Sequence, residues 1–313
     1  MTYMKSSLLG VAAAAALLAA PLSANAEFPE NPVTVVVAYG AGGGVDTISR
    51  AASDALSESL GQPIIVQNRP GAGGGLAVTA LKAEKADGYT VVGTTSTTLT
   101  FDPHAKETGF TVDDFEYIAA FGVFPEALVA LPSRGWKTFA DTIAEAKTGK
   151  TLTYASTTSI DRVVLASIAK REGVTIKPVP TKGGAEAVAQ ALGGHVDFAY
   201  SSGTYYAQAQ AGNLHVLAGL GDSRIVGFPD APTLTELGYD TSSVNMILYL
   251  APKGIPAAAH DKLVAAFKAA GKSEKLLAVL KKRNMGSTVL VGDEITKAIH
   301  AQSKAFKAAL SSN

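Results

Sequence analysis

Cysteine is absent from the 313 residues, and neither sign of charge is in excess. Without cysteine the chain forms no disulfide and has no cysteine for N-terminal lipid attachment, thiolate metal binding or nucleophilic attack. Lysine and arginine together number 27, and so do aspartate and glutamate. No basic face runs along any expected helix, which argues against a nucleic-acid partner.

Long apolar runs are also scarce. The run Leu8–Ala20 follows Lys5 and precedes Ala24-Asn-Ala26, an order typical of a secretory signal peptide. We therefore expect cleavage after Ala26, so that residues 1–26 are a signal peptide and 287 of the 313 residues form a free periplasmic protein of net charge −1. A retained signal anchor is the alternative. No other run approaches the roughly 20 residues of a membrane helix, and the remaining length suits two domains.

Glycine, with 31 residues, is abundant. The apolar, β-branched run Val33–Ala38 predicts a buried strand, and Tyr39–Asp46 predicts a glycine turn after it. Apolar residues at helical spacing then predict a helix from Asp46 to Leu60. A strand, a glycine loop and a helix N-terminus together present free N–H groups and a positive dipole end to an anion.

The same order recurs along the chain, which predicts mostly parallel α/β sheets. In the first half we expect strands at 63–67 and 90–94, a helix at 76–85, and small-residue loops at 68–75 and 94–98. A crossing near 121–131 leads to strands at 152–155, 177–180, 196–200 and 214–218, with small-residue loops at 156–159 and 182–184 and helices at 161–171 and 185–192. A capping pattern predicts a short helix at 233–236. An apolar strand at 242–250 crosses back, before helices at 257–270, 274–282 and 294–311 that we expect on the first domain.

Nucleotide and hydrolase chemistry find little support. Neither G-x-x-x-x-G-K-[ST] nor G-x-G-x-x-G is present at the glycine loops, and the chain has no H-E-x-x-H and no G-x-S-x-G. His195 follows two glycines and fits a surface turn better than a base. Asp46 caps the helix or touches a ligand, and both roles remain open. Glycine loops can be simple tight turns, yet several of them at strand ends favour a binding cleft.

Three stretches, Pro32–Asp46, Gly61–Gly74 and Asp87–Thr90, resemble the periplasmic solute receptors of tripartite tricarboxylate transporters, the Bug family. The resemblance continues through residues 182–184, 193–197, 228–233 and 251–254. It implies a type II periplasmic-binding-protein fold of two α/β lobes with a ligand cleft between them. We expect residues 27–123 in lobe 1, 124–243 in lobe 2, and a return of 244–313 to lobe 1.

The resemblance also implies a function and a set of contacts. The expected ligand is a small carboxylate, a dicarboxylate or an aromatic acid, held by backbone amides, hydroxyls and water rather than by arginines, without cofactor or metal. Carried over by position, the contacts are Tyr39, Ala41, Gly42, Gly43, Asp46, Ser96, Thr97, Ser156, Thr157, Thr158, Thr181, Lys182, Ser201 and Ser202. Ala38 and Gly40 replace usual prolines, Thr158 and Ile160 usual glycines, Val164 a histidine, Ser201 an aspartate and Met246 a tryptophan.

The implied partners are a large and a small membrane subunit that take the ligand from a monomeric receptor. Four aromatic side chains could stack on an aromatic acid or belong to the core: Tyr39, Phe124, Tyr205 and Tyr206. We expect a binding protein, not an enzyme. A receptor that feeds a sensor kinase and, less favoured, an exported enzyme acting on a carboxylic acid are the alternatives.

Overall fold

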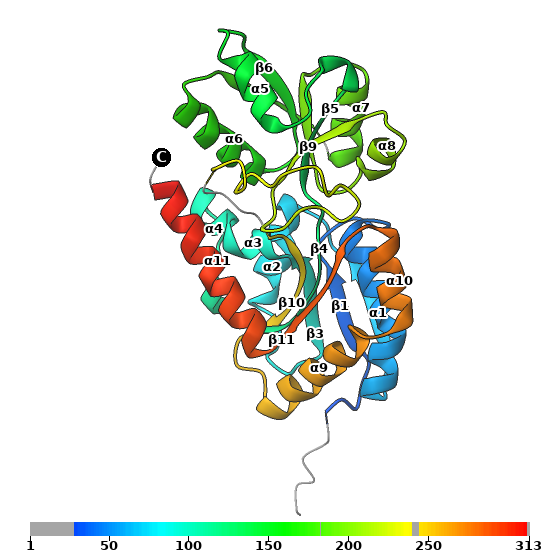
Figure 1. Cartoon of the computed structure of the whole chain (residues 1–313). Coiled ribbons are helices and arrows are strands. Elements are labelled where there is room, and N and C mark those ends of the chain that lie inside the picture. Colours follow the sequence, from blue (N-terminus) through cyan, green and yellow to red (C-terminus); the bar gives the residue numbers. More distant parts are fainter. Residues whose placement is uncertain (1–27, 182, 240–243, 312–313) are drawn as a thin grey trace, which may run out of the picture.

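Two sheets, each with helices packed on it, form the two lobes of the computed structural model (Figure 1). The structure describes residues 28–181, 183–239 and 244–311. The expected signal peptide, Lys182 and the start of the strand expected at 242–250 lie outside the described residues. No described helix is long and apolar enough to cross a membrane.

Lobe 1 is built on a six-stranded sheet in the order β11-β4-β10-β3-β1-β2. Its strands are β1 Val33–Val37, β2 Ile64–Asn68, β3 Thr90–Thr95, β4 Phe115–Val123, β10 Met246–Pro252 and β11 Gly286–Val291. Its helices are α1 Gly44–Leu60, α2 Gly75–Leu81, α3 Ser96–Thr100, α4 Asp102–Ala105, α9 Ala257–Ala270, α10 Glu274–Lys282 and α11 Asp293–Ser311. β1 pairs in parallel with both β2 and β3, whereas β10 runs antiparallel to its neighbours.

Lobe 2 is built on a five-stranded sheet in the order β7-β6-β8-β5-β9. Its strands are β5 Ala127–Ala130, β6 Leu152–Ser156, β7 Ile176–Pro180, β8 Phe198–Ser201 and β9 His215–Gly219. Its helices are α5 Phe139–Ala146, α6 Ser159–Glu172, α7 Gly184–Leu192 and α8 Tyr206–Gln210. β6 pairs in parallel with β7 and β8, and β5 runs antiparallel to β8 and β9. The α/β class is confirmed. The expectation of mostly parallel sheets is wrong, because both sheets are mixed: β10 and β11 pair antiparallel in lobe 1, and β5 pairs antiparallel in lobe 2.

The chain passes between the sheets twice, after β4 and before β10. The two passages touch, because the Phe124 amide donates a hydrogen bond of 2.8 Å to the Asn245 carbonyl oxygen. β4 and β5 are separate strands of different sheets, whereas the sequence predicted one apolar crossing over 121–131. The domain boundaries at 123/124 and 243/244 stay a prediction at the level of single residues.

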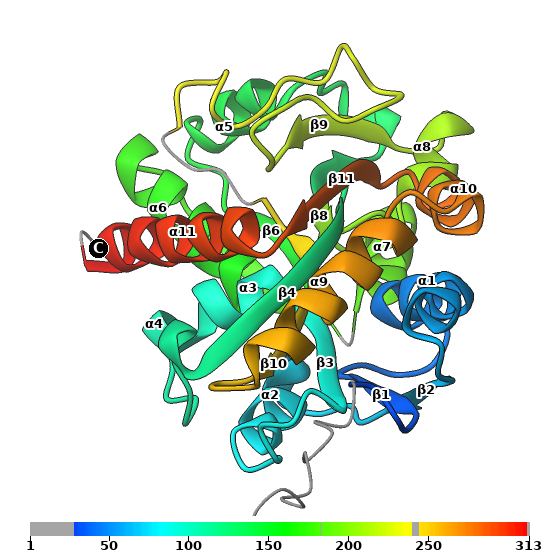
Figure 2. The same ribbon diagram turned by 90° about the horizontal axis from the view of Figure 1, so that it is seen from below.

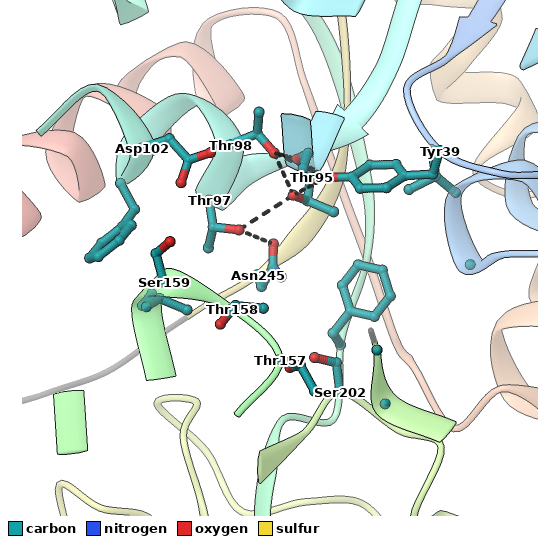
Figure 3. Close-up of a pocket in the computed structure, with 18 of the residues that line it drawn as sticks. Tyr39, Thr95, Thr97, Thr98, Asp102, Thr157, Thr158, Ser159, Ser202 and Asn245 are labelled. Carbon is teal, nitrogen blue, oxygen red and sulfur yellow. Dashed lines mark hydrogen bonds between the residues drawn. The ribbon is translucent and has the colours of Figure 1, made fainter. Parts of the chain in front are cut away.

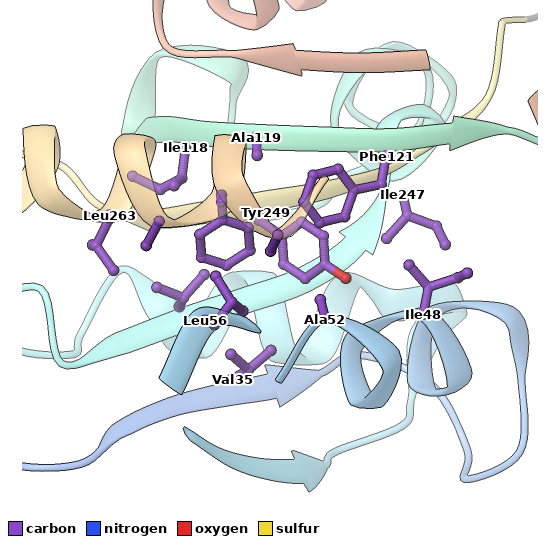
Figure 4. Packing of buried hydrophobic residues seen from close by; sticks show 14 of the residues in the cluster. Val35, Ile48, Ala52, Leu56, Ile118, Ala119, Phe121, Ile247, Tyr249 and Leu263 are labelled. Atoms are coloured by element: carbon purple, nitrogen blue, oxygen red, sulfur yellow. The ribbon is translucent and has the colours of Figure 1, made fainter. Parts of the chain in front are cut away.

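Lobe 1 has a core on each face of its sheet, one against the helices α2, α3 and α11 and the other against α1, α9 and α10. Figure 4 shows Tyr249 and Phe121 of neighbouring strands packed with Leu56 of α1 and Leu263 of α9. The Tyr249 hydroxyl is paired with Ser49 Oγ at 3.0 Å, so its polar atom is satisfied inside the core. This packing fixes α1, and therefore its N-terminal end, against the sheet.

The C-terminal helices lie along lobe 1 (Figure 2). α9 and α10 bury their apolar faces against α1. α11 packs on α3 and β4, yet its Phe306 meets the ring of Phe101 edge-on at 5.3 Å and joins the lobe 2 core. The last helix therefore also reaches the second lobe.

Two local predictions differ from the structure. At 233–236 the capping box forms, with the Thr233 amide donating to Glu236 Oε2 at 2.7 Å, but the segment is a single turn and not a helix. Strand β11 lay in a stretch expected to connect two helices. Its pairing with β4 brings together residues more than 150 positions apart, and such long-range pairing leaves little trace in local sequence.

Candidate functional site

A cleft of about 660 Å³ opens between the lobes. Lobe 1 supplies the N-terminal end of α1 and residues of α3 and α4. Lobe 2 supplies the N-terminal ends of α6 and α7, and Phe124 and Asn245 line the cleft from the two passages. Figure 3 shows hydroxyl side chains facing one another across it, with Thr95, Thr97 and Thr98 on one side and others from lobe 2 opposite.

Tyr39 organises the lobe 1 wall. Its hydroxyl lies 3.0 Å from Thr95 Oγ1, from Thr98 Oγ1 and from the Gly73 carbonyl oxygen. Glycine is required next door at position 74, where φ is +96° and a Cβ would lie 2.8 Å from the Tyr39 hydroxyl. The glycine loop at 68–75 thus leaves room for the side chain of Tyr39, which belongs to the glycine loop at 39–46. Together the two loops present small polar groups to the cleft.

Asp46 holds the first glycine loop to α1. Its carboxylate accepts from the Gly42 amide at 2.8 Å, from Asn68 Nδ2 at 2.9 Å and from Arg50 Nε at 3.0 Å. Burial acts to raise the pKa of Asp46, but these hydrogen bonds and the Arg50 charge outweigh it and lower the pKa. The side chain is buried and does not line the cleft, which fits a capping role.

Asp161 holds the corresponding loop of lobe 2 to α6. Its carboxylate accepts from the amides of Thr157 and Thr158, at 2.9 and 2.7 Å, and from the hydroxyls of Tyr154, Ser156 and Thr158. The side chain is fully buried. Two loop amides that the sequence suggested as ligand donors are therefore already occupied.

Three charged side chains line the cleft among the described residues: Asp102, Lys106 and Arg162. Lys106 Nζ pairs with Asp102 Oδ2 at 2.9 Å. Burial raises the pKa of Asp102 in spite of this pair. The Arg162 guanidinium instead donates to Ser156 Oγ at 3.0 Å and to Ser159 Oγ at 3.3 Å. One arginine thus lines the cleft, and the expectation that amides, hydroxyls and water rather than arginines hold the ligand stays a prediction.

A hydrogen-bond chain crosses behind the cleft through the two passages. Thr97 Oγ1 donates to Asn245 Oδ1 at 3.3 Å, and Asn245 Nδ2 donates to Glu126 Oε1 at 3.0 Å. The Tyr200 hydroxyl of lobe 2 donates to the same Glu126 oxygen at 2.6 Å. A polar wall residue of lobe 1 is thus connected to lobe 2 through both passages.

The fourteen predicted contacts divide by position. Six line the cleft: Tyr39, Gly43, Thr97, Thr157, Thr158 and Ser202. Seven lie beside or behind it: Ala41 and Gly42 on an exposed turn, Thr181 in partial exposure, and Asp46, Ser96, Ser156 and Ser201 buried. Lys182 lies outside the described residues. Contact of any of the fourteen with a ligand stays a prediction.

The aromatic candidates divide as well. Tyr39 and Phe124 line the cleft, whereas Tyr205 and Tyr206 belong to the lobe 2 core. His195 lies in an exposed turn, as the sequence predicted.

Several lining residues were missed by sequence reasoning. Gly73, Thr95, Thr98, Ser159, Gly183 and Gly184 belong to loops already singled out, so a wider selection would have included them. Phe101, Asp102, Lys106, Arg162 and Asn245 gave no such signal, because which face they turn to the cleft depends on how the lobes pack. No group of acidic and histidine side chains among the described residues could hold a metal ion.

Comparison with known proteins decides the family. The sequence profile of the "Tripartite tricarboxylate transporter family receptor" matches residues 48–312. The chain belongs to this family. As a family member it is a periplasmic solute-binding receptor of the TctC type. A UPF0065 protein from the gbd 5' region of Cupriavidus necator is 35% identical over 269 residues, which cover 83% of this chain and 82% of that protein.

Solved structures agree with this receptor's fold. A TctC solute-binding protein from Polaromonas, solved without ligand, is 28% identical with a TM-score of 0.78, covering 91% of this chain and all of that one. MatC from Rhodopseudomonas palustris with bound malate (23% identity, TM-score 0.74, 90% and 100% covered) shares the fold. So does R. palustris Rpa4515 with adipate (22%, 0.71, 91% and 96%). The two-lobed periplasmic-binding-protein fold is confirmed.

Proposed function

We propose that this receptor captures a small carboxylate in the cleft by lobe closure and delivers it to the large and small membrane subunits of a tripartite tricarboxylate transporter. The observation that carries the proposal is the cleft itself. It is lined from both lobes by hydroxyls and by the N-terminal ends of α1, α6 and α7, which favour an anion. The fold-level neighbours bound to malate and adipate support the same ligand class.

The energetics require contacts from both lobes. About four hydrogen bonds to a carboxylate, at roughly 1.5 to 3 kcal/mol each, give about 6 to 12 kcal/mol before costs. Lost translational freedom and ordering cost a comparable amount. A micromolar affinity, about −8 kcal/mol, therefore needs a second anchor from the opposite lobe. A ligand that bridges both lobes shifts the population toward the closed form.

We propose the six lining residues named above as ligand contacts, together with Gly44 at the start of α1 and Asn245 between the lobes. Asp46 and Asp161 then act by shaping the loops. We also propose that residues 1–26 direct export to the periplasm and are removed after Ala26, and that the mature receptor is a monomer.

A binding role is favoured over catalysis by the cleft's chemistry. No histidine lines the cleft among the described residues, and its acid Asp102 is paired with Lys106. A general base beside a reactive hydroxyl is therefore missing from that lining. An exported enzyme acting on a carboxylic acid and a receptor feeding a sensor kinase remain the alternatives.

Thermal unfolding of residues 27–313 with a panel of mono-, di- and aromatic carboxylates tests the proposal. A ligand at 100 times its Kd stabilises the folded state by about 2.7 kcal/mol, which raises Tm by several degrees. Product analysis of the same mixtures separates binding from turnover. A chain that gains no stability with any acid, or that converts one, would overturn the proposal. Uptake of the identified acid into vesicles that hold both membrane subunits tests delivery.

A further inference from the structure

The cleft carries a cation whose charge is not matched by a neighbouring acid. Lys106 is paired with Asp102 at 2.9 Å, so this pair contributes little net charge. Arg162 has no acidic oxygen within 4.0 Å among the residues that the structure describes. Its hydrogen-bond partners in this part of the chain are two serine hydroxyls. Of the three charged lining residues, Arg162 alone is left without a counter-charge in this part of the chain.

Asp161, although next in sequence, does not supply that counter-charge. Its carboxylate already accepts hydrogen bonds from two amides and three hydroxyls, and it is fully buried. Ser156 stands between the two groups, because its hydroxyl donates to Asp161 Oδ1 at 2.6 Å and accepts from Arg162 at 3.0 Å. The two aspartates at the starts of α1 and α6 also offset part of the helix dipoles, so those helix ends alone are a weaker anion site.

Two serine hydroxyls hold the Arg162 guanidinium in a fixed orientation, in which it can bind a planar anion. Two of its five N–H groups donate to Ser156 and Ser159, which lie on either side of the turn into α6. Three N–H groups remain, and a guanidinium fork matches a carboxylate with two parallel hydrogen bonds. Arg162 is half-buried, so its bond to an anion is screened less than one at the surface.

We propose that Arg162 binds a second acid group of the ligand and so makes the receptor prefer dicarboxylates over monocarboxylates of the same length. This inference rests on the proposed function. The first acid group lies at the lobe 1 wall, near the N-terminal end of α1 and the threonine hydroxyls. The second meets Arg162 on lobe 2, and only a diacid bridges the lobes at both ends.

Isothermal titration of residues 27–313 with two matched acid pairs, succinate with butanoate and adipate with hexanoate, tests the proposal. We expect the wild type to bind one diacid at least tenfold tighter than its monoacid. Arg162→Gln keeps hydrogen-bonding capacity but removes the charge. This variant should bind that diacid at least tenfold more weakly than the wild type and the monoacid less than threefold more weakly. Arg162→Lys, which keeps the charge without the fork, should recover part of the preference.

A cation outside the cleft serves as the control. Lys268→Gln removes one charge from an exposed position on α9, away from the cleft, and should leave all four affinities unchanged. Circular dichroism and unliganded Tm check that each variant folds. Should Arg162→Gln fail to fold, Ser159→Ala removes one hydroxyl that holds the guanidinium and should reduce the preference about threefold.

The outcomes separate the two proposals. Equal affinity of the wild type for mono- and diacids would overturn the role of Arg162 while the proposed function stands. So would an equal loss of affinity for both acids in Arg162→Gln, or an unchanged diacid affinity in that variant. A wild type that binds none of these acids nor any acid of the thermal panel overturns both proposals.

Discussion

Asp46 and Asp161 occupy the same position in the two lobes. Each is the third residue of the helix that follows a cleft loop. The Asp46 carboxylate accepts from one backbone amide of its loop, and the Asp161 carboxylate accepts from two. The lobes differ in the cation that follows. Arg50 forms an ion pair with Asp46 at 3.0 Å. Arg162 forms no such pair with Asp161 and lines the cleft instead. The two lobes therefore use the same kind of capping aspartate, but the lobe 1 wall of the cleft has paired charges, whereas the lobe 2 wall carries the charge of Arg162.

Asp161 should be one of the costliest aspartates to replace. Asp161→Asn keeps the shape but turns an N–H₂ group toward donors, which leaves buried N–H and O–H groups without an acceptor. We expect the free energy of unfolding to fall by about 2 to 4 kcal/mol, measured by urea unfolding at pH 7. Asp230→Asn changes an exposed aspartate of the same lobe and should cost less than about 0.5 kcal/mol. Similar losses in the two variants would contradict this account.

Asp46 should give the receptor an acid-sensitive part of its stability. The pKa of Asp46 is lowered in the folded state, so the unfolded chain binds its proton first as pH falls. The stabilisation is complete above the usual pKa of about 4 and is lost as pH falls through the lowered folded value. The difference in unfolding free energy between wild type and Asp46→Asn should therefore be constant from pH 5 to 7 and shrink towards pH 2.5.

Urea titrations of both proteins across this range supply the measurement. Other acids with lowered pKa, such as Asp141 and Glu145, are present in both proteins and cancel in the difference. A difference that stays constant down to pH 2.5 would show that the Asp46 carboxylate is not favoured by its partners in the folded chain.

How much of the fold the sequence predicts depends on how local the signal is. The helices at 257–270 and 274–282 were predicted with the bounds that the structure has, because helical spacing and caps are local. α5 was missed although Thr138 and Asp141 form a capping box that is visible in the sequence. Strand β11 could not be predicted from local sequence, since its partner β4 lies far away in the chain.

The candidate site shows the same limit. The small-residue loops at strand ends were predicted, because parallel strands bring such loops to one edge of the sheet. The capture of the Thr157 and Thr158 amides by Asp161 was missed, although Thr158 and Asp161 form the same kind of capping box as Thr138 and Asp141. The placement of Arg162 could not be predicted, because it depends on two serine hydroxyls that hold its guanidinium at the cleft.

Replacement of Gly44 by alanine should weaken carboxylate binding. A Cβ at Gly44 would lie 3.1 Å from the Phe124 ring, which also lines the cleft. Gly44→Ala should displace this ring toward the cleft and weaken carboxylate binding at least tenfold, about 1.4 kcal/mol. Gly75 is the matched control. It begins α2 as Gly44 begins α1, but a Cβ there meets nothing closer than 3.7 Å and Gly75 does not line the cleft.

Titration of both variants with the acid that binds the wild type measures the effect. Gly75→Ala should keep wild-type affinity and gain slightly in Tm, because alanine favours a helix over glycine. If Gly44→Ala binds as tightly as Gly75→Ala, the N-terminal end of α1 does not form part of the binding surface.

Two buried tyrosines of lobe 2 should respond in opposite ways to loss of the hydroxyl. Tyr200 donates to Glu126 Oε1 at 2.6 Å, and burial together with the Glu126 charge raises the pKa of Tyr200 well above 10. The Tyr205 hydroxyl is buried without a hydrogen-bond partner among the described residues. Tyr200→Phe therefore leaves a buried carboxylate with one donor fewer, whereas Tyr205→Phe removes a polar atom that was costly to bury.

Urea unfolding at pH 7 should show a loss of about 1.5 to 3 kcal/mol for Tyr200→Phe and no loss, or a gain of up to about 1 kcal/mol, for Tyr205→Phe. Both substitutions remove the same atom from a fully buried ring, so cavity and transfer effects are matched. The difference between them then reports the Tyr200–Glu126 hydrogen bond, which joins lobe 2 to the first passage. Equal losses would mean that the Glu126 carboxylate gains nothing from Tyr200 in the folded receptor.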